Sequence, residues 1–133
     1  MKVENRVEVA IVMIVRGGRV LIRRRLPDAP FASYWEFPGG KCEAGESPES
    51  CAAREVREEL SVDVKLTQRW APLDHDYPDR CVRLHPFLGT ILSGVLRPLG
   101  CSEIRWVDKS ALPSYSFPEA NLPLLCRLWR QNG

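Results

Sequence analysis

Short apolar stretches with strand character alternate along this chain with two stretches of helical periodicity. β-Branched residues recur at positions 7–15 and 20–24, and such residues favour strands. Residues 16–19 between them carry two glycines, which indicates a hairpin turn. Four further stretches have strand composition, and two stretches are polar or rich in turn-forming residues. The predicted strands are residues 34–37, 62–73, 81–92 and 103–107, and the predicted loop and turn are residues 26–33 and 74–80.

The strongest helical pattern covers residues 48–60. Ser47 is a suitable N-cap, and Pro48 suits the first helical position. At about 100° per residue, one apolar stripe of this helix consists of Ala52, Ala53, Val56 and Leu60. A closing helix is expected within residues 118–130, starting near Leu122. Strands and helices in this order predict an α/β (α+β) fold with a mixed sheet.

A second stripe of the first helix is acidic. Glu55, Glu58 and Glu59 lie together because positions i, i+3 and i+4 are neighbours on a helix. Arg54 and Arg57 are expected on the far side of this stripe, although Arg54 can pair with Glu58. Gathered carboxylates repel one another unless a cation lies among them, and oxygen ligands suit a hard divalent metal. The alternative is a solvated helix face with ion pairs, but the double glycine and aromatic strand before the helix favour the metal.

Composition narrows the class of protein. The 133 residues suit one small domain, expected over residues 1–133, and a net charge of +2 gives no general attraction to nucleic acid or membrane. The positive charge is uneven, because residues 23–25 form a run of arginines, and the simplest interpretation of this run is an ordinary solvated strand end. Five cysteines without CxxC spacing indicate reduced thiols in a cytoplasm. Residues 6–15 are too short to span a bilayer, and no targeting segment is recognised.

Residues 40–62 resemble the signature of the Nudix hydrolase family. That signature is a Gly, five residues, a Glu, seven residues, Arg-Glu, an aliphatic residue, any residue, Glu-Glu, any residue, Gly and an aliphatic residue. Its positions are matched by Gly40, Glu46, Arg54, Glu55, Val56, Glu58, Glu59 and Val62. One position departs, because Ser61 stands where the family has a Gly that ends the helix with positive φ. Ser61 removes no ligand.

The resemblance implies the Nudix fold, in which a mixed sheet is sandwiched between helices. It implies hydrolysis of a pyrophosphate bond with Mg²⁺, or alternatively Mn²⁺, as cofactor. The metal ligands and catalytic acids would be Glu55, Glu58 and Glu59, beside a backbone carbonyl of Gly39 or Gly40. Arg54 would orient a catalytic carboxylate, or else form an exposed ion pair. Glu46 would brace the loop against the helix, or else add charge at the helix N-terminus.

Beyond the signature, the chain resembles the MutT group of this family, which removes oxidised guanine nucleotides from the pool. Residues 35–41 are similar to the MutT segment that leads into the signature, which implies substrate contacts from Glu36, Phe37, Pro38 and Gly39. Arg25 falls where that group has a substrate-binding Arg, and residues 77–80 resemble a stretch near the base pocket. Asn121 matches an Asn that reads the purine edge. The alternatives are a solvated strand end for Arg25, ordinary core for Phe37 and a helix N-cap for Asn121.

MutT-like chains often carry a further metal-binding Glu where this chain has Gly100. Either the helix alone supplies enough ligands, or Asp108 or a water replaces the missing one. Glu103 is assigned to the neighbouring strand. A His found in some relatives is Pro30 here.

The resemblance implies a nucleoside triphosphate pyrophosphohydrolase that releases a monophosphate and pyrophosphate, with 8-oxo-dGTP as the candidate substrate. This reaction would sanitise the nucleotide pool and support DNA repair. The alternatives are an enzyme for CTP or a modified dCTP, a non-catalytic Nudix module that binds modified bases, and an acidic helix that binds a protein partner. We expect a nucleotide as the partner, no stable nucleic-acid or membrane partner, and a monomer or homodimer.

Overall fold

One mixed sheet organises the structure, a computed structural model that describes residues 6–30 and 32–130. Its path runs β3-β2-β1-β7-β5, while β4 pairs with β1, β6 with β7 and β8 with β2. The strands are β1 (Arg6–Arg16), β2 (Arg19–Arg24), β3 (Trp35–Glu36), β4 (Gly39–Lys41), β5 (Val62–Arg69), β6 (Leu73–Tyr77), β7 (Arg80–Gly94) and β8 (Glu103–Asp108). The helices are α1 (Pro48–Leu60), η1 (Lys109–Ser114), η2 (Glu119–Asn121) and α2 (Leu122–Arg130).

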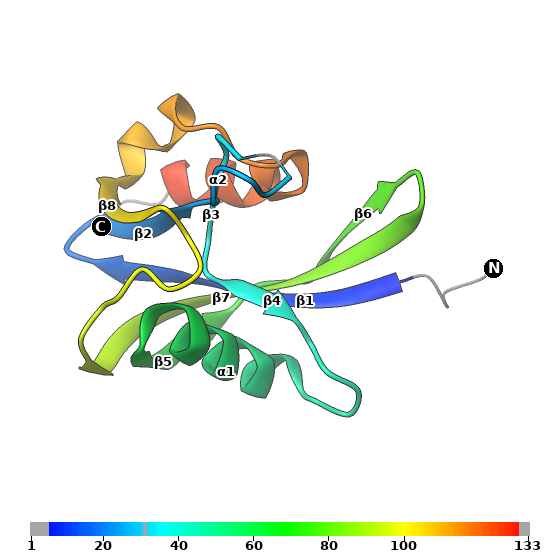
Figure 1. Cartoon of the computed structure of the whole chain (residues 1–133), viewed down its shortest axis with the longest axis horizontal. Coiled ribbons are helices and arrows are strands. Elements are labelled where there is room, and N and C mark those ends of the chain that lie inside the picture. The colour runs from blue at the N-terminus through cyan, green and yellow to red at the C-terminus, as the bar shows by residue number, and fades with distance from the viewer. Residues whose placement is uncertain (1–5, 31, 131–133) are drawn as a thin grey trace.

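The central strand β1 makes the sheet mixed. It runs parallel to β7 over nine paired positions and antiparallel to β2 and β4. Helix α1 lies on one side of the strands, and α2 with the 3₁₀ helices η1 and η2 lies on the other (Figure 1). The expected fold class, an α/β (α+β) Nudix fold with a mixed sheet between helices, is confirmed.

Strand β1 divides the core between the two faces of the sheet, because successive strand side chains point to opposite sides. Ala10, Val12 and Ile14 are fully buried and pack with α1. Ile11 and Met13 are buried on the other face, in the group that includes α2. The apolar run at residues 7–15 is therefore explained by a strand that is buried on both faces.

Helix α1 begins and ends as its sequence predicts. Ser47 Oγ accepts a hydrogen bond from Ser50 N at 3.1 Å, and Pro48 follows as the first helical residue. Ser61 takes the left-handed conformation, with φ at 62°, and donates its backbone N–H to Arg57 O. It therefore fills the conformational role that the family gives to Gly.

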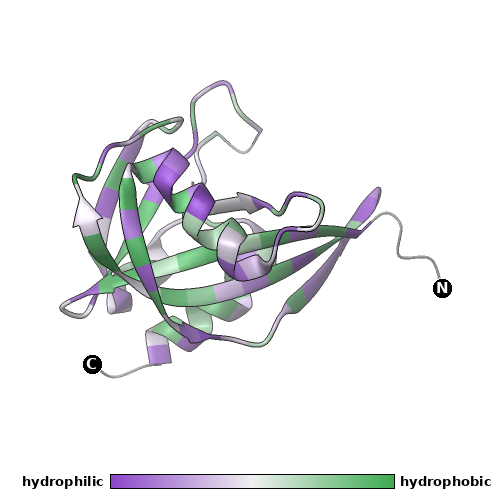
Figure 2. Ribbon diagram, turned by 90° about the horizontal axis from the view of Figure 1, so that it is seen from below, coloured by the Kyte–Doolittle hydropathy of each residue, from purple (hydrophilic) through white to green (hydrophobic). Residues whose placement is uncertain are grey.

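The buried stripe of α1 differs from the prediction by one residue. Cys51 is buried with Ala52, Val56 and Leu60, whereas Ala53 is only half-buried. Figure 2 shows α1 crossing the sheet with hydrophilic and hydrophobic residues alternating along it. All the helices within residues 6–30 and 32–130 are too short or too polar to span a membrane.

Two short strands, β6 and β4, were not predicted from the sequence. Residues 73–77 form β6, paired with β7, because Asp74 on β6 binds Arg83 across the ladder at 2.7 Å. The double glycine forms β4 against β1, and β3 is limited to Trp35–Glu36. A Cβ on Gly39 would lie 2.1 Å from the Ala10 carbonyl oxygen, so only glycine lets β4 approach β1 this closely.

The closing helix was correctly predicted to start near Leu122, since α2 spans Leu122–Arg130. Strands β5 and β7 overlap the predictions for residues 62–73 and 81–92, although β5 ends at Arg69 and β7 extends to Gly94.

Candidate active site

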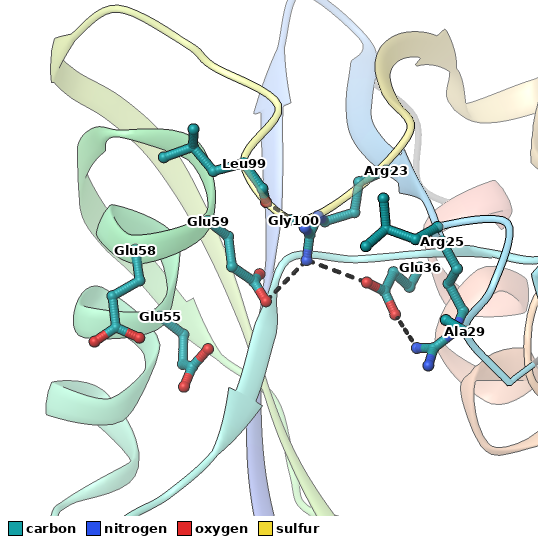
Figure 3. Close-up of a pocket in the computed structure, with 10 residues that line it drawn as sticks. Arg23, Arg25, Ala29, Glu36, Glu55, Glu58, Glu59, Leu99 and Gly100 are labelled. Atoms are coloured by element: carbon teal, nitrogen blue, oxygen red, sulfur yellow. Dashed lines mark hydrogen bonds and ion pairs between the residues drawn. The ribbon is translucent and has the colours of Figure 1, made fainter.

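A pocket of about 400 Å³ opens where α1 faces strands β2 and β3 (Figure 3). The structure brings Glu55, Glu58 and Glu59 together on the α1 side of this pocket. Arg25 and Glu36 lie on the opposite side. The full lining consists of Arg23, Arg25, Leu26, Ala29, Glu36, Glu55, Glu58, Glu59, Leu99 and Gly100.

A chain of ion pairs crosses the pocket wall (Figure 3). Arg23 Nη1 lies 2.8 Å from Glu59 Oε2 and 3.1 Å from Glu36 Oε2, and Arg25 Nη1 lies 2.7 Å from Glu36 Oε1. The interpretation of the arginine run as a solvated strand end is wrong for Arg23, which is 3% exposed. Its place could have been inferred from strand alternation, because Arg23 lies on the same face of β2 as the buried Leu21.

Glu59 is the acid most strongly affected by its surroundings. Burial raises the pKa of its carboxyl to about 7, although the Arg23 guanidinium and the Gly39 N–H both favour the charged form. Gly39 N donates to Glu59 Oε1 at 2.9 Å, so both carboxylate oxygens have a partner. A further cation near Glu59 would stabilise its ionised form.

Arg54 links the acids of the signature to one another. The predicted pairing of Arg54 with Glu58 is confirmed at 3.2 Å, whereas the expectation that Arg54 lies on the far side of the acidic stripe is wrong, because its guanidinium also contacts Glu55 at 2.9 Å. It also binds both oxygens of Glu46, at 2.7 and 2.9 Å, and this pairing lowers the Glu46 pKa to about 2. Glu46 thereby braces the loop after β4 against α1. Arg57 instead pairs with an aspartate at the start of β5.

The donors around the pocket fit a hard divalent cation, since carboxylate oxygens are the ligands that Mg²⁺ prefers. Gly40 lies directly against the Glu55 carboxylate, because a Cβ there would be 2.5 Å from it. A glycine is therefore needed for Glu55 to lie against β4. The Gly40 carbonyl oxygen accepts a hydrogen bond from Cys51 Sγ at 3.5 Å. Within the residues described, the acids pair with arginines, and no three of them lie close enough together to form a ligand group.

Gly100 lies in the pocket wall, on the loop that enters β8. Leu99 anchors that loop, because its N–H donates to the Glu59 main-chain oxygen at 3.1 Å and its carbonyl accepts from Arg23 Nη2 at 2.8 Å. Asp108 does not replace the missing acid. It ends β8, away from the pocket, and pairs with Arg19 at 3.3 Å.

A second pocket, of about 280 Å³, shares Arg25 and Glu36 with the first. Asn121 lines it and is 8% exposed, at the end of η2 immediately before α2. Phe37 is buried against Phe117, with ring centroids 5.1 Å apart, and still lines the pocket. The remaining lining is Val9, Ile11, Gly39, Gly40, Lys41, Tyr77, Arg80, Val82, Leu84, Pro118 and Ala120.

One predicted substrate residue lies apart from both pockets. Pro38 is buried, and its carbonyl accepts a hydrogen bond from Val12 N at 2.9 Å. Its position therefore suggests a role in joining β3 to β4 rather than in contacting substrate.

Comparison with known proteins decides the family. Residues 9–127 match the family described as NUDIX domain. The chain belongs to the Nudix family. A solved MutT NUDIX hydrolase from Burkholderia pseudomallei has a similar fold, with a TM-score of 0.81 and 27% identity over 92% of this chain and 97% of that one. The sequence-based recognition of a Nudix, MutT-like chain is confirmed.

Two proteins of Escherichia coli K12 are similar over most of their length. An 8-oxo-dGTP diphosphatase is 32% identical over 114 residues, covering 86% of this chain and 88% of that protein. A CTP pyrophosphohydrolase is 29% identical over 119 residues, covering 90% and 88%. Membership in this Nudix group confirms the expected enzyme class, a pyrophosphohydrolase among the hydrolases that act on acid anhydrides.

Proposed function

We propose that this Nudix enzyme hydrolyses a nucleoside triphosphate and releases a nucleoside monophosphate and pyrophosphate. The observation that carries the proposal is the pair of adjoining pockets that share Arg25 and Glu36. The acidic pocket suits a triphosphate with its metal, and the pocket lined by Phe37 and Asn121 suits a base. Each part of a nucleotide thus has a chemically matched place.

A divalent ion, Mg²⁺ or Mn²⁺, would be held by Glu55, Glu58 and Glu59 with a backbone carbonyl of Gly39 or Gly40. When bound, it supplies positive charge that stabilises the phosphate oxygens during hydrolysis. The family membership supports this assignment, because Nudix hydrolases generally use divalent metal ions.

The arginines of the site orient acids and phosphates. Arg54 holds the Glu55 and Glu58 carboxylates from one side, which limits their rotation when they accept a proton or a cation. Arg25 is anchored by Glu36 at 2.7 Å and by the Pro30 carbonyl at 2.7 Å. Because it borders both pockets, its guanidinium is suited to bind a phosphate between the base and the reacting bond.

Base recognition is assigned to the second pocket. The Asn121 amide can donate and accept hydrogen bonds at once, which matches a purine edge. Phe37 gives a rigid apolar wall next to that amide. We propose 8-oxo-dGTP as the substrate because the similar enzyme of E. coli has that activity in its name. The reaction would then remove oxidised nucleotides in the cytoplasm, and the five free cysteines support this location.

A nucleotide panel with Mg²⁺, scored by the products formed, tests the substrate. We expect pyrophosphate from 8-oxo-dGTP at far lower substrate concentration than from dGTP. A preference for CTP or a modified dCTP would instead support the second candidate, which the similarity to the E. coli CTP pyrophosphohydrolase favours.

The Glu58→Gln variant tests the chemistry. It should lower Mg²⁺-dependent turnover on the order of a hundredfold, because a charged ligand becomes neutral. Glu49→Gln is the matched control, since Glu49 is an exposed acid of the same helix that pairs with Arg69 outside the pocket. Turnover unchanged by Glu58→Gln would contradict the mechanism. Unchanged ligand affinity in a protein without turnover would indicate a binding module.

A further inference from the structure

The proposed metal pocket already contains a buried cation. Arg23 lies between α1 and β3, and its guanidinium reaches Glu59, Glu36 and the Leu99 carbonyl oxygen. The residue is 3% exposed, and its Nε has no hydrogen-bond partner among the residues described. Arginine keeps its charge at any pH at which a protein is folded, so this positive charge is permanent.

The net charge of the side chains around the pocket matches the charge of one divalent ion. Arg23, Arg25 and Arg54 are paired with a network of five carboxylates. Those carboxylates belong to Glu36, Glu46, Glu55, Glu58 and Glu59. Five negative charges against three positive ones leave two, which a single divalent cation neutralises. Without the Arg23 guanidinium, the deficit would exceed the charge of one such ion.

The geometry separates the place of Arg23 from the place of the metal. Arg23 lies beside Gly100, since an added Cβ there would be 3.8 Å from Arg23 Nη2. Because Gly100 has no side chain, the loop contributes no carboxylate at this point. Glu55 and Glu58 lie on the other side of Glu59 (Figure 3), and their described ion pairs are with Arg54 alone. The Arg23 guanidinium therefore already supplies a positive charge on the side of Glu59 that faces the loop of Leu99 and Gly100. A metal ion is needed only on the opposite side of Glu59.

We propose that Arg23 is a positioning residue that serves as the fixed cation of this site, in the place that a second divalent ion would otherwise occupy. The nucleotide-free enzyme then takes a single divalent ion, bound on the side of Glu59 that faces Glu55 and Glu58. Two-metal sites offset the charge of clustered carboxylates with two ions close together, and here Arg23 replaces one of them. The inference rests on the proposed function, because it assumes that these acids bind metal.

Titration of the nucleotide-free protein with Mn²⁺, with free Mn²⁺ followed by electron paramagnetic resonance, measures the number of bound ions. We expect a single ion for the wild type and two for Arg23→Gln, which removes the charge. Arg23→Lys keeps the charge and should bind a single ion. Arg19→Gln changes an exposed arginine of the same strand that is paired with Asp108, and should match the wild type.

Two ions bound to the wild type would overturn the inference, as would Arg23→Gln with one ion at unchanged affinity. Circular dichroism reports whether each variant folds. If Arg23→Gln does not fold, the numbers of Mn²⁺ ions bound by the wild type and by Arg23→Lys decide the outcome. A wild type that binds two ions and keeps its Mg²⁺-dependent turnover would refute only the role of Arg23. A wild type that binds no ion and has no turnover would refute the proposed function as well.

Discussion

The raised pKa of Glu59 makes the stability of the metal-free enzyme depend on pH. In the folded state the carboxyl binds a proton below about pH 7, whereas its ordinary value is 4.5. Between these values the native state holds more protons than the unfolded state, so the free energy of unfolding falls as pH rises. A pKa difference from 4.5 to about 7 corresponds to at most about 3 kcal/mol. The Glu59 side chain is 20% exposed, so solvent reduces this figure only in part.

The Glu59→Gln variant removes this contribution, because glutamine resembles the protonated carboxyl and does not titrate. Urea unfolding of both proteins with a chelator, at about pH 5 and about pH 8, gives the difference in free energy of unfolding. We expect the wild type to lose up to about 3 kcal/mol relative to the variant as pH rises. Added Mg²⁺ should stabilise the wild type more than Glu59→Gln at the higher pH, because the ion favours the charged carboxylate.

Two results would refute this reasoning. The first is a stability difference between wild type and Glu59→Gln that does not change with pH. The second is a wild type that becomes more stable than the variant as pH rises, which would mean that Arg23 and the Gly39 N–H outweigh burial and lower the pKa.

Three further perturbations test other parts of the structure. Arg23→Gln should cost about 3–5 kcal/mol in urea unfolding, because it removes the buried cation that pairs with the partly buried Glu36 and Glu59. A loss below about 1 kcal/mol, on the order of a surface pair, would contradict its buried role. Leu60→Ala should lower the free energy of unfolding by about 2–5 kcal/mol, while Leu122→Ala, at a residue that is 47% exposed, should lower it far less. Equal losses would mean that Leu60 is not part of the core. Asn121→Ala should raise KM for the preferred nucleotide more than it lowers kcat in steady-state assays, and an unchanged KM would remove Asn121 from base recognition.

Helix α1 and its acids could be predicted because they depend on neighbours in sequence. Ser47 and Pro48 set the helix start through local hydrogen bonding and backbone geometry. The 3.6-residue period then places Glu55, Glu58 and Glu59 on one face whatever the rest of the chain does. The signature spacing follows from the same helix, and for this reason the family was recognisable from residues 40–62.

The elements that were not predicted from the sequence depend on contacts between residues far apart in the chain. The double glycine was not predicted as a strand because nothing local shows that Gly39 must pass within reach of the Ala10 carbonyl. Residues 74–80 were predicted as a turn because their charges look solvated until β7 supplies Arg83 as a cross-strand partner for Asp74 on β6. Apart from its pairing with Glu58, Arg54 was expected on the far side of the acids, because a helical wheel does not show how far a long side chain bends.

The sequence by itself determined the fold family, the acidic stripe and therefore the class of reaction, since each follows from spacing along one helix. Only the tertiary structure placed Arg23 in the pocket, because its partners Glu36 and Glu59 come from separate elements. The same holds for the second pocket, where Asn121 and Phe37 meet from distant parts of the chain. In the sequence, Arg23 is one of three consecutive arginines and looks solvated. Its charge becomes part of the site only when the sheet and α1 pack around it in the folded protein.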